Sequence, residues 1–138
     1  MDLRLSSRRE SGWFIVQVEG ELDIATRDQL RRRLKRALVR RGRHARLVVD
    51  LSRLGFCDAS GLAALLDAHA TALEHQGQLR LAIPEGRVLR VFRLTDLDRV
   101  LPVYPTVRDA VEGRDAVRDA TRDVVRDALR DGQVEQSA

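Results

Sequence analysis

The pattern of hydrophobic and polar positions along this chain alternates between two kinds of segment. Short runs rich in β-branched and aromatic residues indicate strands, and they cover residues 3–5, 13–19, 46–51, 78–83 and 100–103. The first two runs are separated only by a short polar segment, so we expect them to form a hairpin. The third run lacks alternation, which is typical of a strand covered on both faces.

Two long helical segments lie between these runs. The first is expected to begin at Thr26, where Gln29 completes the spacing of a capping box, and to end near Gly42. The second begins at Asp58-Ala59-Ser60-Gly61 and ends near Gln76. Apolar residues recurring every three or four positions mark the inner faces. They are Leu30, Leu34 and Leu38 in the first helix, and Leu62, Leu65, Leu66, His69 and Leu73 in the second.

Two shorter helices complete the pattern. One is anchored by Leu89 and Phe92, with Val88 as a further buried position, and Thr106 caps the other. Strands that alternate with helices indicate an α/β domain with helices packed on a parallel sheet, to which the hairpin adds one antiparallel pair. We therefore predict a mainly parallel mixed sheet of four to five strands with about four helices packed on it.

The last part of the chain has a different composition. Arg-Asp pairs recur with a strict period of four between residues 114 and 131. On a helix each aspartate would lie three residues before the next arginine, which is a favourable spacing. We therefore expect one domain over residues 1–113 and a helical extension over 114–138 with a frayed end. Its apolar seam is narrow, which leaves open a solvated helix, a partner helix and a homodimer contact.

Composition limits the classes of protein. The 138 residues contain no apolar stretch of the roughly 20 residues that a membrane span needs. A single cysteine, Cys57, fits a reducing compartment, so we expect a cytoplasmic protein. Residues 27–46 hold ten basic residues against Asp28 alone. We interpret them mainly as a solvated helix face, and nucleic-acid binding is disfavoured because no aromatic residue lies among them to stack on a base.

Catalytic motifs are not found. The three histidines, at 44, 69 and 75, lack the spacing of metal ligands, and Ser60 lacks the Gly-x-Ser-x-Gly context of an activated nucleophile. Glycine-rich phosphate loops are absent, and Cys57 is expected to be a buried, inert residue. We therefore expect no enzymatic activity, no cofactor and no metal.

The start of the second long helix is the remaining candidate for a functional site. Capping explains Asp58 and Ser60 there, because an aspartate or serine accepts hydrogen bonds from free helical N–H groups. The wider pattern, however, resembles the STAS family, the domain of anti-sigma factor antagonists and of sulfate-transporter tails. The similar segments are Gly20-Glu21-Leu22-Asp23, Leu47 to Ser52, Phe56 to Leu62, and Val103 to Val107.

The resemblance covers about residues 3–112 and implies docking on an anti-sigma factor that is itself a serine kinase, with release of a sigma factor. The partner-binding residues that it implies are Asp23, Asp58, Ala59, Ser60, Gly61 and Leu62. In the family, the kinase phosphorylates a serine directly after the aspartate, and this chain has Ala59 there.

Three hypotheses follow from this departure. The chain binds its partner constitutively, or Ser60 is a substitute phosphorylation site, or the domain is a STAS adaptor in a signalling scaffold or a lipid-transport complex. An alternative of another class is nucleic-acid binding through the basic residues 27–46.

Overall fold

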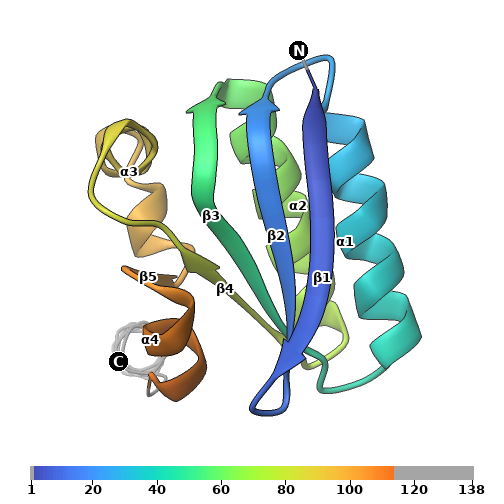
Figure 1. The fold of residues 1–138 in the computed structure, drawn as a ribbon. Helices are drawn as coiled ribbons and strands as arrows, with labels where there is room; N and C mark the ends of the chain where they lie inside the picture. Colours follow the sequence, from blue (N-terminus) through green and yellow to red (C-terminus); the bar gives the residue numbers. More distant parts are fainter. Residues whose placement is uncertain (1, 114–138) are drawn as a thin grey trace, which may run out of the picture.

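The computed structural model describes residues 2–113, which form one five-stranded sheet with the strand order β1-β2-β3-β4-β5 (Figure 1). The strands are β1 Leu3–Glu10, β2 Trp13–Leu22, β3 Arg46–Cys57, β4 Gln78–Ala82 and β5 Val103–Tyr104. The helices are α1 Arg27–Arg41, α2 Ala59–Glu74, α3 Arg87–Leu94, the short 3-10 helix η1 Leu97–Arg99, and α4 Val107–Glu112. Strand β1 pairs antiparallel with β2, and all other pairs are parallel. The predicted fold class is confirmed.

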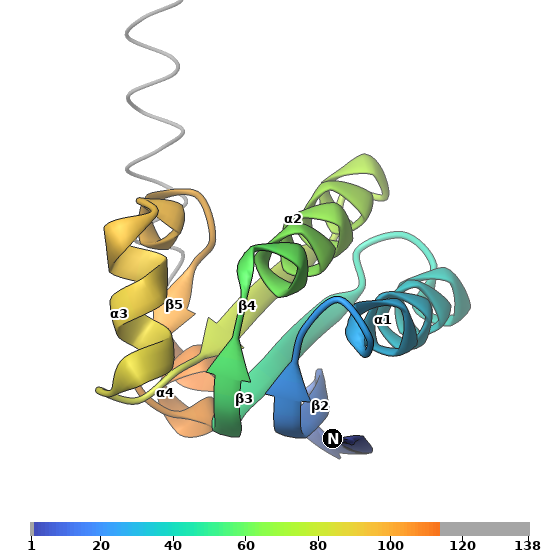
Figure 2. The same cartoon turned by 90° about the horizontal axis from the view of Figure 1, so that it is seen from above.

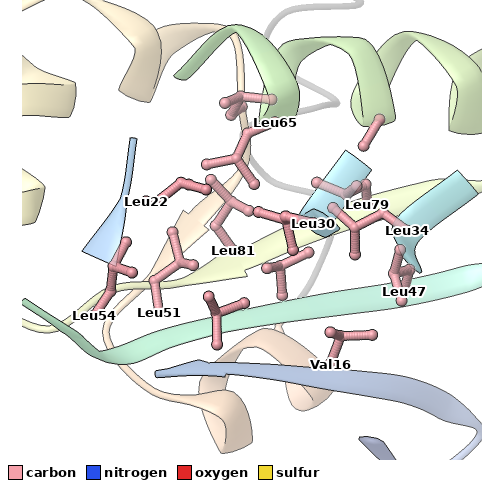
Figure 3. Close-up of a cluster of buried hydrophobic side chains, with 14 of the residues drawn as sticks. Val16, Leu22, Leu30, Leu34, Leu47, Leu51, Leu54, Leu65, Leu79 and Leu81 are labelled. Atoms are coloured by element: carbon pink, nitrogen blue, oxygen red, sulfur yellow. The ribbon is translucent and has the colours of Figure 1, made fainter. Parts of the chain in front are cut away.

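The helices lie on both faces of the sheet. Helices α1 and α2 cover one face, and α4 lies on the other (Figure 2). Leucines and valines from the sheet and from α1, α2 and α3 form the main core between the layers, and Figure 3 shows part of it. A smaller cluster, on the face of the sheet that α4 covers, consists of Trp13, Ile15, Val48, Ala82 and Ala110. Apolar residues on both faces of β3 explain why that strand shows no alternation in the sequence.

Several predicted details are wrong. Leu73 is 46% exposed, because the buried face of α2 follows the small residues Ala64, Ala68 and Ala72 instead. Strand β3 continues past residue 51 to Cys57, with irregular pairing to β2 near its end. The last strand begins at Val103 instead of residue 100, since the backbone N–H groups of Val100 and Leu101 still donate to Leu97 O in the turn that ends the 3-10 helix.

The predicted capping box at the start of α1 is also wrong. Thr26 is the N-cap residue, but its side chain makes no capping hydrogen bond to the helix. The Gln29 side chain instead donates to the backbone oxygen of Leu3, at 3.0 Å. In contrast, Thr106 caps α4 as predicted, with its hydroxyl oxygen accepting from Asp109 N at 3.0 Å.

Arg80 fastens α4 to the sheet. It is 4% exposed, and its Nη1 donates to the backbone oxygens of Ala110 at 2.6 Å and Gly113 at 2.7 Å. Its guanidinium lies 4.5 Å from the ring centre of Trp13. One buried side chain thus satisfies two carbonyls at the end of α4. The predicted Arg-Asp extension, 114–138, lies outside the described residues.

Candidate functional site

The carboxyl ends of β2 and β3 lie side by side at one end of the sheet, at the top in Figure 1. Leu22 pairs with Cys57 there, and Asp58 N donates to Leu22 O at 3.1 Å. The loop from β2 to α1 and the start of α2 therefore meet at this end. The two segments that the sequence singled out, around Asp23 and around Asp58, are brought together.

The Asp58 carboxylate organises the start of α2. Its Oδ1 accepts from Ser60 Oγ at 2.6 Å and from Gly61 N at 3.0 Å, which caps α2. These hydrogen bonds, the one from the Ser60 hydroxyl most of all, lower the pKa of Asp58, and the backbone N–H of Ile24 in the β2–α1 loop also contributes. The carboxylate thus holds the start of α2 in place.

The Asp23 carboxylate stabilises its own loop. Its Oδ1 accepts from Ala25 N at 2.9 Å and from Thr26 N at 3.1 Å, in the geometry of an aspartate turn. The Thr26 hydroxyl donates to Glu21 O at 2.8 Å, and its oxygen accepts from Asp23 N at 3.0 Å. Both aspartates that the resemblance assigned to partner binding are therefore engaged within the chain.

Gly61 and Leu62 are buried beneath this surface. A Cβ atom at Gly61 would lie 2.6 Å from Leu22 Cγ and 3.0 Å from Leu22 O, so any larger residue would force Leu22 to shift where α2 crosses the end of β2. Leu62 is 5% exposed and belongs to the main core. These two residues position the helix start, and they offer almost no side-chain surface of their own.

The exposed groups at this end are mostly apolar. Ala59 is exposed and Ser60 is half-buried, with its hydroxyl bonded to Asp58. Ile24 is 71% exposed in the loop, and Phe56 is 49% exposed at the end of β3. Neither residue is among the binding residues predicted from the sequence. An isoleucine between the turn-forming Asp23 and Thr26 breaks the polar pattern of a loop, and this irregularity could have revealed it.

Cys57 lies beneath the same end of the sheet. It is 5% exposed, and burial, followed by the charge of Asp58, raises the pKa of its thiol to about 12. The thiol is therefore protonated at neutral pH and is a poor nucleophile. Within residues 2–113 no cluster of three or more His, Cys, Asp or Glu residues could hold a metal ion. The same residues contain no helix that could span a membrane.

Comparisons with known proteins agree with this fold. An anti-sigma F factor antagonist from Paenibacillus polymyxa is 27% identical over 117 residues, which is 85% of this chain and 99% of that protein. The crystal structure of an anti-sigma factor antagonist from Mycobacterium paratuberculosis superposes with a TM-score of 0.72 and 27% identity, covering 85% of this chain and 95% of that one. The unphosphorylated anti-sigma factor antagonist SpoIIAA gives a TM-score of 0.57 at 21% identity, covering 85% and 98%.

The sequence model of the STAS domain matches residues 4–110, a range that contains all five strands except the first residue of β1 and includes the whole of the site described above. Because this match covers well over half of the chain, the protein belongs to the STAS domain family.

Proposed function

We propose that this protein is an anti-sigma factor antagonist that binds an anti-sigma factor through the end of the sheet where β2 and β3 finish. The docking surface consists of Ile24, Phe56, Ala59 and Ser60. Relatives that match almost over their whole length are anti-sigma factor antagonists, which supports this role. The protein acts by binding, and no catalytic group is needed for it.

The proposal rests on the different roles of the polar and the apolar residues at this end of the sheet. Asp58 and Asp23 hold the loop and the helix start in place, and apolar side chains face solvent beside them. Exposed large apolar residues that are held by a rigid scaffold are typical anchors of protein interfaces. Ile24 and Phe56 therefore supply the contact area, and the two aspartates supply its geometry.

We further propose that binding is not controlled by phosphorylation of this surface. SpoIIAA, which has this fold, has been solved in both phosphorylated and unphosphorylated forms. Here the residue after Asp58 is Ala59, which cannot accept a phosphate. Ser60 is a poor substitute because its hydroxyl donates to Asp58 at 2.6 Å, and phosphorylation would break that bond and place a dianion beside a carboxylate. The protein consequently binds its partner constitutively.

The docking surface is tested with Ala59→Glu. The native chain is used to purify its partner from the source organism, and an anti-sigma factor of the serine-kinase type is expected. In calorimetric titration with that protein, a charge at position 59 is expected to weaken binding at least about tenfold, because a carboxylate must be desolvated in the interface. Ala70→Glu is the matched control, since Ala70 is an exposed alanine three turns further along α2. Equal affinity of both variants and the native chain would refute the docking surface.

The apolar anchors are tested separately. Ile24→Ala and Phe56→Ala are each expected to weaken binding about tenfold or more, as for buried anchors at an interface. Leu94→Ala is the control, because Leu94 is 78% exposed at the far end of α3. A loss of affinity in Leu94→Ala as large as in the other two variants would place the interface elsewhere.

Phosphorylation is tested with the same partner and labelled ATP. The native chain is expected to remain unlabelled, and Ala59→Ser is expected to gain label at residue 59, because that position is exposed. Label on Ser60 of the native chain would overturn constitutive binding. Purification of a complex that contains no sigma-factor regulator would instead favour the adaptor hypothesis.

A further inference from the structure

A groove between α1 and the hairpin strands is lined by seven residues, of which four are arginines. Its volume is about 300 Å³, which is at the small end of the range for ligand sites. The lining side chains that matter are Ser7, Phe14, Arg33, Arg36, Arg40 and Arg41. The arginines occupy one side of α1, since residues 33, 36 and 40 recur at helical spacing.

These guanidinium groups have no carboxylate partner. The lining contains no aspartate or glutamate, and within the described part of the chain none of the four arginines forms an ion pair. Other exposed arginines do, such as Arg31 with Asp28 at 3.2 Å. Like charges that gather in a concave surface without counter-charges attract anions.

Two of the arginines are held in place. Arg33 Nη2 donates to Ser7 Oγ at 2.9 Å, which fixes it against β1. The Arg41 guanidinium lies 4.2 Å from the ring centre of Phe14. Partial burial and then the charge of Arg9 lower the pKa of Arg41, as expected where cations crowd together. Arg36 and Arg40 are exposed and can close on a ligand.

We propose that this groove binds a small anion with two or more phosphate groups. Planar guanidinium groups donate two parallel hydrogen bonds to phosphate oxygens, and several of them match a chain of linked phosphates. The Ser7 hydroxyl, which accepts from Arg33, keeps its own hydrogen to donate to the ligand. A nucleic-acid strand fits less well because Arg41 covers the face of Phe14 on which a base would stack. This site is separate from the docking surface and goes beyond the proposed function.

Calorimetric titration with sodium tripolyphosphate tests the proposal. Saturable one-to-one binding is expected at low salt, with affinity falling as salt rises, because an exposed charged site is screened. Arg36→Ala/Arg40→Ala is expected to weaken binding at least about tenfold. Arg32→Ala/Lys35→Ala is the matched control, since both residues are exposed on α1 and lie outside the groove lining. All four substituted positions are exposed, so both variants are expected to fold, which circular dichroism checks.

The outcomes separate the hypotheses. Absence of saturable binding would overturn the site. An equal loss of affinity in the two double variants would also overturn it, because the binding would then come from the charge of α1 as a whole. Tighter binding of duplex DNA than of tripolyphosphate, with equal loss in both variants, would overturn it in favour of a nucleic-acid surface. ATP is titrated alongside: equal affinity indicates a bare oligophosphate, and tighter binding indicates phosphates carried on a nucleoside.

Discussion

Replacement of Asp58 tests whether one carboxylate holds the candidate site together. In Asp58→Ala the N-cap bond to Gly61 N is lost, which costs about 1–2 kcal/mol at helix starts. The Ser60 hydroxyl also loses its acceptor. Because Asp58 is only half-buried, water replaces part of these bonds. We expect a loss of about 2 kcal/mol, a large share of the roughly 5–15 kcal/mol that stabilises a domain.

Asp58→Asn removes the charge of residue 58 but keeps a side-chain oxygen that can cap α2. Asparagine caps helices about as well as aspartate, so a cost of only about 0.5 kcal/mol is expected at pH 7. The hydrogen bonds lower the pKa of Asp58 in the folded state, so its charge stabilises the fold above its unfolded pKa. That contribution is lost as pH falls through the folded pKa. The difference between the native chain and Asp58→Asn should therefore shrink from about pH 5 downward and vanish well below about pH 4.

Urea unfolding at several pH values measures both effects. Trp13 is the only tryptophan and is 5% exposed, so its fluorescence reports unfolding. Asp67→Asn is the matched control, because it removes the same charge from an exposed position on α2 and is expected to change stability by less than about 0.5 kcal/mol. A cost below about 0.5 kcal/mol in Asp58→Ala, or a difference in Asp58→Asn that does not depend on pH, would refute the reasoning.

Three further predictions concern the supports of the site and of α4. Gly61→Ala should lower the free energy of unfolding by about 1–3 kcal/mol because its Cβ meets Leu22, whereas Gly55→Ala, whose Cβ would lie 3.6 Å from its nearest neighbour, should cost less; thermal unfolding compares them. Cys57, with its pKa raised to about 12, should resist iodoacetamide at pH 8 in the native chain and react in urea, and mass spectrometry detects either result. Arg80→Met should lower the free energy of unfolding in urea by about 2–4 kcal/mol, because two carbonyls at the end of α4 lose their donor. An unchanged stability in Gly61→Ala or Arg80→Met, or rapid alkylation of native Cys57, would contradict the contacts described for that residue.

The order of the elements was predictable because each is encoded locally. Leucines four residues apart, such as Leu30 and Leu34, predict a helix and the face of α1 that is buried, without any knowledge of its tertiary contacts. Details failed where tertiary contacts decide the outcome. Leu73 has the helical spacing of a core residue, but the face of α2 that is buried carries Ala64, Ala68 and Ala72 instead. Gln29 likewise has the right type for a capping box, yet β1 offers its side chain a backbone acceptor.

The candidate site was only partly predictable for the same reason. The sequence located Asp23 and Asp58, because they stand where strands end and helices begin. It could not show that the two segments meet, because the contact that joins them, from Asp58 N to Leu22 O, links residues far apart in the sequence. It also missed Ile24 and Phe56, whose exposure depends on how β2 and β3 end together. A resemblance to a family transfers residue positions, whereas the role of each side chain depends on its contacts.

The two proposed sites should act independently, because they lie at opposite ends of α1. The docking surface adjoins the start of α1, and Arg36, Arg40 and Arg41 lie toward its end. From Arg27 to Arg40 the helix rises about 20 Å, at 1.5 Å for each residue. Exposed charges separated by more than about 8 Å are largely screened at physiological salt. Ala59→Glu should therefore leave tripolyphosphate affinity unchanged, and Arg36→Ala/Arg40→Ala should leave affinity for the anti-sigma factor unchanged. If either variant alters both affinities at about 150 mM salt, the two surfaces are coupled through the fold or form one interface.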